Sequence, residues 1–484
     1  METTDVRSND GHSAQAYGPQ EPGESSLPDK GTAPLIVLCE VTAESGIRIP
    51  DRAGTTTPSH IPTKDIILKG LINVEDAVSL LSTFQQHYGR WVSFDPSLPT
   101  ALLLDVVRRS PLLLSACCLI AVRHTSQDLA ARLAPNLLSE ARSQLSIALL
   151  TTPQPVEFLQ AALLLCMWST TIARIPLSID SWLLSSFALQ HSTISGFSSS
   201  ATPQFTEGGV TPGLDKLYVW NHLCLAHLHY CVGTGRKTVL DQDDIERCRR
   251  VLIVGRASNF ESRMVAEVHL YWIIYESSRN PVDLPKTQSA LHAWREEWKH
   301  LFEEPRSQFI QMGFHFVQLL AYDRSLKSRS AAVQETLLNE MIRLSTAIME
   351  LAMDTTDERT RHLSDHIYHM ITFAAVTMIR LLHKYEELLR STYDLEDLDG
   401  LVLALATWLH AIGLPCHIAY TMGDVVTAFH KKLRPDTQPS PSTSYADVDP
   451  TIQDEFAQFF PELFGHSPLD PIHMPMLPDF QPTP

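Results

Sequence analysis

Three histidines late in the chain have the spacing of metal ligands. His362, His366 and His369 stand at positions i, i+4 and i+7, so a helix through them would place all three imidazoles on one face. Three imidazoles on one face could share a zinc ion. The sequence lacks the glutamate of the helical zinc-protease motif at this place, and histidine triplets on helices commonly line a bundle groove. We therefore expect these histidines to be structural.

A second set of candidate zinc ligands lies near the middle of the chain. Cys224, His227 and Cys231 share one face of a predicted helix. A closed zinc site needs a fourth ligand from elsewhere, and cysteine on an apolar helical face behaves as a small core residue. We expect these residues to belong to the core.

Two further patterns have the residue types of phosphate chemistry. The acidic run at 241–246, DQDDIE, is similar to the clusters with which all-α isoprenoid cyclases hold magnesium. Its spacing is wrong, and no second metal motif follows, so we expect the first turn of a helix. Gly233 and Gly235 lack the third glycine of a dinucleotide loop and follow a helix instead of a strand. We expect no catalytic residue, metal ligand or cofactor.

The stretch 214–237 predicts the helix around which the other elements pack. Its apolar residues recur at three- and four-residue intervals, at Leu217, Trp220, Cys224, Leu228 and Cys231. The run stops at Gly233 and Gly235, where glycine allows the left-handed backbone that often closes a helix. The pattern indicates a buried helix with a fixed exit.

The rest of the chain shows helical periodicity and no sustained period-two alternation. Asn73 is a predicted helix cap, and Pro111 marks a break in the apolar stretch 101–122. Further helices are expected at 126–150, 156–173, 178–196, 241–254, 258–278, 284–302, 306–327, 331–353, 360–392, 396–412 and 416–433. The fold class is therefore all-α, with a multi-helix domain at 66–433.

Polar segments flank the predicted domain. Residues 1–65 are rich in Ser, Thr, Gly and Pro, which predicts disorder, and they contain Cys39 alone. Residues 434–484 combine a Pro/Ser linker with an acidic, aromatic segment of the kind used for transcriptional activation, around Phe456, Phe459 and Phe460. This segment either binds a coactivator or docks on its own domain.

Charge and composition exclude several classes of protein. The formal net charge of −17 opposes a surface built for phosphates, and no apolar run is long enough to span a membrane. The N-terminus lacks the features of a secretory signal, and most of the eight cysteines stand in apolar surroundings typical of reduced thiols. We expect a protein of the cytoplasm or nucleus.

Several of the predicted helices contain motifs that resemble those of a known protein family. Trp220-Asn221 with Leu223, Leu228-His229-Tyr230 and the ending Val232-Gly233-Thr234-Gly235-Arg236 resemble the middle homology region of fungal zinc binuclear cluster transcription factors. Two upstream stretches fit the same pattern, Arg109 to Leu113 and Ser181 to Ser185. The resemblance covers roughly residues 70 to 435.

This resemblance implies a helical regulatory domain in a nuclear transcription regulator. In the family such a domain accepts effectors or partner proteins, so other transcription factors, coactivators and a small-molecule effector are the expected partners. The six cysteines of the zinc cluster are not found in residues 1–65, so we expect no direct DNA binding without a partner. The alternatives are a helical enzyme of the isoprenoid-cyclase type and a scaffold with no transcriptional output.

Overall fold

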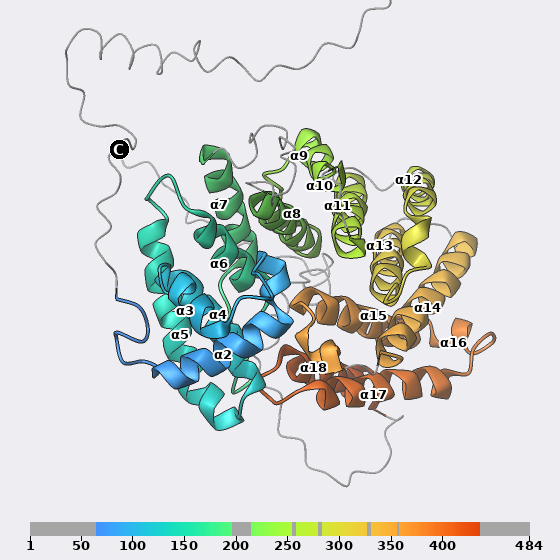
Figure 1. Cartoon of the computed structure of the whole chain (residues 1–484). Helices are drawn as coiled ribbons and strands as arrows, with labels where there is room; N and C mark the ends of the chain where they lie inside the picture. The colour runs from blue at the N-terminus through green and yellow to red at the C-terminus, as the bar shows by residue number, and fades with distance from the viewer. Residues whose placement is uncertain are drawn as a thin grey trace, which may run out of the picture. The chain divides into compact units, whose positions relative to one another are not determined.

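The computed structural model describes residues 64–195, 214–253, 258–278, 283–326, 331–355 and 358–435. The chain divides into two units, and all described residues belong to the second, His60–Pro484. The described part is almost entirely helical, as the sequence predicts (Figure 1). The acidic, aromatic tail with Phe456, Phe459 and Phe460 lies outside the described residues.

The first part of the body consists of six helices. They are α2 (Val74–His87), α3 (Thr100–Val107), α4 (Pro111–Ala121), α5 (Gln127–Ala148), α6 (Val156–Met167) and α7 (Ser181–Ile194). The Asn73 side chain caps α2 by accepting a hydrogen bond from the Asp76 amide at 2.7 Å. The predicted break is present, because α4 begins at Pro111 after the Ser110 cap. Two short 3₁₀ helices, Gly89–Val92 and Val122–His124, join this part.

The helix predicted at 156–173 is wrong at its C-terminal end. It stops at Met167, and the chain then forms a small antiparallel hairpin of β1 (Thr170–Ile172) and β2 (Ile175–Leu177). Ala173 and Arg174 both have positive φ, at 49° and 68°, as a tight hairpin turn requires. The β-branched run Thr170-Thr171-Ile172 favours extended backbone, and tertiary contacts of these residues decide the outcome.

The middle of the body continues with α8 (Leu214–Thr234), α9 (Gln242–Arg247), α10 (Arg250–Ile253), α11 (Asn259–Ser278), α12 (Leu284–Glu297), α13 (Gln308–Leu326) and α14 (Ala331–Met353). A 3₁₀ turn, Lys299–Phe302, follows α12. Helix α8 packs against α6, α7 and α11. Every residue from Val219 to Val232 is buried, so α8 lies inside the body as its periodicity predicts.

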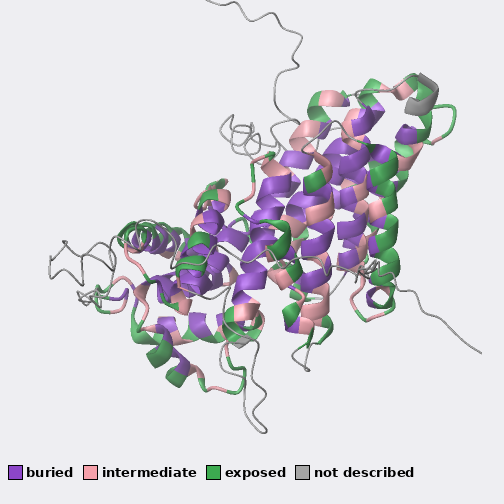
Figure 2. Cartoon of the chain, turned by 90° about the horizontal axis from the view of Figure 1, so that it is seen from above, coloured by how far each residue is buried: buried purple, intermediate pink, exposed green. Residues whose placement is uncertain are grey.

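The last part contains α15 (Asp365–Lys384), α16 (Glu386–Leu389), α17 (Leu395–Ile412) and α18 (Ile418–Leu433). The single helix predicted at 360–392 is therefore divided. A 3₁₀ turn, Glu358–His362, comes first, Ser364 precedes α15, and Tyr385 separates α15 from α16. Helix α15 packs against α13, α14, α17 and α18, and most of its residues are buried. Figure 2 shows buried residues gathered on the inner helices of the body and exposed residues on the outer ones.

Two charged residues at the limits of the predicted domain are buried in the body. Asp65 is 4% exposed and pairs with Arg108 at 2.8 Å. Arg434 is 8% exposed and pairs with Asp399 at 2.8 Å. Each pair holds the end of the described body against one of its helices. Among the described residues, no helix combines the length and apolarity needed to cross a membrane.

Candidate functional site

The most extensive buried polar group of the body centres on Arg123, in the 3₁₀ turn after α4. Its side chain is fully buried and donates to the Tyr88 hydroxyl at 2.9 Å and the Ser169 carbonyl at 3.1 Å. Asp365, the first residue of α15, supplies the opposite charge at 3.7 Å. A buried guanidinium requires such partners, because an unpaired charge in the interior is very unfavourable.

Asp365 is held by the segment between α6 and β1. Its Oδ2 atom accepts hydrogen bonds from the Ser169 amide at 2.7 Å and the Ser169 hydroxyl at 2.6 Å. Burial raises the pKa of this carboxyl to about 6, although Arg123 and the Ser169 hydrogen bonds oppose the rise. The Arg123–Asp365 pair therefore joins the first helices of the body to the last ones.

Two histidines, His124 and His362, hydrogen-bond the Tyr88 hydroxyl, and two more, His87 and His417, lie beside them. His362 accepts or donates a hydrogen bond at 3.1 Å to the Tyr88 hydroxyl and stacks on His87 at 3.7 Å between ring centres. The His124 ring lies 4.4 Å from that of His362 and 6.2 Å from that of His417. Burial, together with nearby His87 and Arg123, lowers the pKa of His362 to about 3. At neutral pH the histidines around Tyr88 are therefore uncharged, and Arg123 is the buried cation beside them.

Further contacts tie this polar cluster to the C-terminal helices. The Trp168 indole donates to the Leu363 carbonyl at 3.0 Å, and the Thr171 amide donates to the Cys416 carbonyl at 2.8 Å. His417 bonds the Arg361 carbonyl at 2.7 Å and caps α18 through the Ala419 amide. The cluster is therefore the joint at which α2, α4, β1, α15 and α18 meet.

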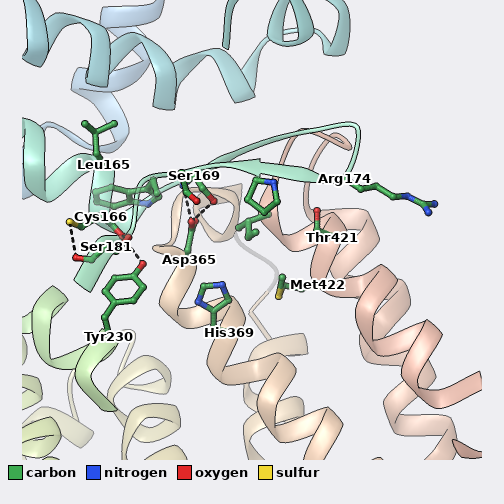
Figure 3. A pocket seen from close by; sticks show the side chains of 14 residues that line it. Leu165, Cys166, Ser169, Arg174, Ser181, Tyr230, Asp365, His369, Thr421 and Met422 are labelled. Carbon is green, nitrogen blue, oxygen red and sulfur yellow. Dashed lines mark hydrogen bonds between the residues drawn. The ribbon is translucent and has the colours of Figure 1, made fainter. Parts of the chain in front are cut away.

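A small cavity adjoins this joint between the end of α6, β2, α8, α15 and α18 (Figure 3). It has a volume of about 40 Å³, which is room for about three water molecules. Its polar lining includes Asp365, His369, Tyr230 and Thr421, and the Tyr230 hydroxyl donates to the Cys166 carbonyl at 2.6 Å. Burial lowers the pKa of His369 to about 4. A cavity of this size admits water but no organic substrate.

The helical body matches a known protein family. The family model of the middle domain of the transcriptional activator of proteases prtT matches residues 70–433. The chain belongs to this family. The matched range covers nearly all of the described helical body, so the prtT-type middle domain is the helical array with the polar joint described above. The sequence-based resemblance to a fungal transcription factor middle region is confirmed.

Individual relatives agree with this assignment. An uncharacterised transcriptional regulatory protein of Schizosaccharomyces pombe is 29% identical over 394 residues, which are 78% of this chain and 73% of that protein. Transcriptional activators of proteases prtT from Aspergillus clavatus and Penicillium rubens are 26% and 29% identical, over 78% and 65% of this chain. The alignments span 57% and 48% of those two activators. No solved structure matches the chain.

The three spaced histidines do not converge in this prtT-type domain. His362 precedes α15 and joins the Tyr88 cluster, His366 stacks on His229 at 3.6 Å, and His369 lines the small cavity. His366 also hydrogen-bonds the Tyr271 hydroxyl. No group of metal-binding side chains was found among the described residues. Each histidine therefore makes its own structural contact.

The Cys224, His227 and Cys231 set is also part of the core. His227 bonds Ser185 Oγ at 3.0 Å and lies 3.4 Å from Cys231 Sγ. Burial raises the pKa of the Cys231 thiol to about 12, and it raises the pKa of Cys224 well above the ordinary value. Both thiols are buried on the inner face of α8, where cysteine acts as a small core residue.

The acidic run and the two glycines have structural positions. Asp241 caps α9 and forms a capping box with Asp244, which confirms the predicted helix-starting turn. Gly233 does not end α8, because the helix continues to Thr234. Gly235 follows with φ of +66°, as a left-handed helix end requires.

The remaining family-motif residues are fixed by contacts on both sides of α8. Trp220 is 2% exposed, and the Asn221 amide donates to the Cys248 carbonyl at 2.9 Å. Arg236 pairs with Asp180, the α7 cap, at 2.7 Å and lies over the Trp182 ring. These motif residues anchor α8 to α7, α9 and α10, which accounts for their role as packing residues.

The sequence alone does not predict the Arg123 cluster. Its members are far apart in the chain, since Ser169 and Asp365 are separated by 196 positions. No local spacing rule connects them. The one available signal was an Arg-His pair at the end of the apolar run that forms α4, where a charge so close to buried residues needs a partner.

Proposed function

We propose that this chain is a nuclear transcription regulator that controls a set of metabolic genes. The observation that carries the proposal is the family match, which spans residues 70–433. Two relatives are named as transcriptional activators of proteases, so genes for proteases are the first targets to examine. An enzymatic role of the cyclase type has no support from the acidic run, whose carboxylates cap α9.

The helical body acts in this proposal as the regulatory and partner-binding part. A formal net charge of −17 repels DNA phosphates, and the sequence ahead of the body contains Cys39 alone. We propose that the helical body reaches promoters through a second protein, for which a zinc-cluster factor is the matching kind. Coactivators are the partners expected for the acidic, aromatic tail.

Two measurements test this route. Purified chain at physiological salt is expected to select no motif from random DNA oligonucleotides, because its formal net charge of −17 opposes contact with the phosphates. The tagged protein in cells is expected to occupy chromatin, and to lose that occupancy when its zinc-cluster partner is removed. A defined motif recovered with the purified chain alone would contradict the partner route.

The tail is tested separately with a fusion of residues 435–484 to a heterologous DNA-binding domain. The fusion is expected to activate a reporter, because aromatic residues among acidic ones bind coactivator grooves. Replacement of Phe456, Phe459 and Phe460 by Ala should abolish activation, whereas Phe480→Ala in the Pro-rich end is the matched control. A silent wild-type fusion would instead favour docking of the tail on the body.

A further inference from the structure

A second pocket, distinct from the polar joint, lies where α13 and α15 end. It has a volume of about 180 Å³ and is lined by one face of α15, with Thr377, Arg380, Leu381 and Lys384. From α13 come Asp323 and Leu326, and Tyr385 follows α15. An engineered cavity of about 150 Å³ holds benzene, so this pocket has room for a ligand of roughly six to nine heavy atoms.

The lining carries two cations on one helix. Arg380 and Lys384 stand one turn apart on α15, so their side chains project from the same face. Arg380 is half-buried, and its side chain makes no ion pair or hydrogen bond with any residue that the structure describes. A guanidinium without a partner at a pocket wall is available to bind a carboxylate through two parallel hydrogen bonds.

The opposite wall suits a positive group. Asp323 lines the pocket from α13 and makes no ion pair with any residue that the structure describes. Helices α13 and α15 both end at the pocket, at Leu326 and Lys384, and the C-terminal end of a helix carries partial negative charge. An ammonium group is therefore favoured on the Asp323 side.

A buried hydroxyl on the α15 wall gives an independent sign of a ligand. Thr377 is 1% exposed, and its Oγ1 atom has no hydrogen-bond partner within the described part of the chain. A buried hydroxyl without a partner is unfavourable, and a polar group bound in the pocket would satisfy it. Leu326 and Leu381 provide apolar contacts beside it.

We propose that this pocket binds a free α-amino acid. The carboxylate pairs with Arg380 and Lys384, the ammonium pairs with Asp323, and the Thr377 hydroxyl hydrogen-bonds the ligand between them. The ligand's side chain lies against Leu326 and Leu381. A dicarboxylic acid fits less well, because Asp323 would repel its second negative charge. Binding at this site is independent of the proposed transcriptional role.

The test is direct binding to the full chain. Each of the common L-amino acids is screened by thermal shift and then titrated by calorimetry, and at least one is expected to bind with Kd below about 1 mM, the weak end of specific affinity. The N-acetyl derivative lacks the ammonium and the amide derivative lacks the carboxylate, so both should fail to bind. A dipeptide is titrated in parallel. A site for free amino acids should bind the dipeptide more weakly than the amino acid, whereas a site for a peptide terminus should bind the dipeptide more strongly.

Variants locate the ligand. Arg380→Gln and Asp323→Asn should each weaken binding by about 10- to 100-fold, as loss of one charged hydrogen-bond partner does. Arg343→Gln is the matched control, because Arg343 is an exposed arginine on α14 that pairs with Glu340. Lys384→Gln, at an exposed position, removes the second cation of the proposed carboxylate site and should also weaken binding. Circular dichroism confirms that each variant is folded.

Three outcomes would overturn the proposal. The first is the absence of binding by every amino acid below about 1 mM. The second is equal binding of the N-acetyl derivative, which would show a simple carboxylate site, or stronger binding of the dipeptide. The third is unchanged affinity in folded Arg380→Gln and Asp323→Asn chains, which would place the ligand elsewhere.

Discussion

Replacing Arg123 by methionine should destabilise the body strongly. The substitution keeps side-chain length but removes the hydrogen bonds to Tyr88 and Ser169 and the charge that faces Asp365. Removal of one member of a buried ion pair typically costs about 3–5 kcal/mol, because the other member stays buried. We therefore expect a loss of about that size in the free energy of unfolding, measured by urea denaturation with circular dichroism at pH 7.

A double-mutant cycle identifies the cause of this loss. Asp365→Asn keeps an acceptor for Ser169 and removes the charge, so Arg123→Met should be less damaging in that background by about 1–3 kcal/mol. The control Arg343→Met disrupts an exposed pair with Glu340 and should cost at most about 1 kcal/mol. A loss below about 1 kcal/mol for Arg123→Met would refute the reasoning.

The pH dependence of the same variant gives a second check. The pKa of Asp365 is already raised to about 6 by burial, and removal of Arg123 raises it further. The folded variant then binds a proton that the unfolded chain releases above its ordinary pKa of 3.8. The defect of Arg123→Met should therefore shrink as the pH falls from 7 towards 5. A constant or growing defect would contradict the charge-based explanation.

Three further predictions concern the buried histidines and α8. Burial lowers the pKa of His229 to about 3 and that of His369 to about 4, so below pH 6.5 the unfolded chain binds more protons than the folded one. Each of these two histidines should therefore remove about 1.4 kcal/mol of stability by pH 5.5. The urea midpoint should fall accordingly between pH 7 and 5.5, and a flat profile would refute this. Gly235→Ala should cost about 1–2 kcal/mol at its φ of +66°, whereas Gly400→Ala inside α17 should stabilise by about 0.5–1 kcal/mol in the same urea assay. Trp220→Ala should lower the free energy of unfolding by about 3–5 kcal/mol, and unchanged melting would exclude its role in the core.

Local signals predicted the helices well. The Asn73 cap, the break at Pro111 and the extent of α11 and α14 follow from capping chemistry, proline geometry and apolar periodicity. The errors occur where tertiary contacts decide. The hairpin after Met167 is held by the Thr171 amide on Cys416 and by Ser169 on Asp365, and neither partner is near it in sequence.

The candidate sites also differ in how far local sequence predicts them. Spacing within one helix placed Cys224, His227 and Cys231 correctly on α8 but could not show which residues face them. The polar joint and the α13–α15 pocket each combine residues from separate helices, so their composition depends on the packing of those helices. The Asp241 turn was predictable because its capping partner is three residues away.

The central claim, that this chain regulates transcription, is tested most directly by nascent transcripts after rapid depletion of the protein from the nucleus. The proposed function predicts that transcription of the genes it occupies changes within minutes, with protease genes among them, and that restoring the full chain reverses the change. The claim is contradicted if depletion changes the transcription of none of the genes that the protein occupies.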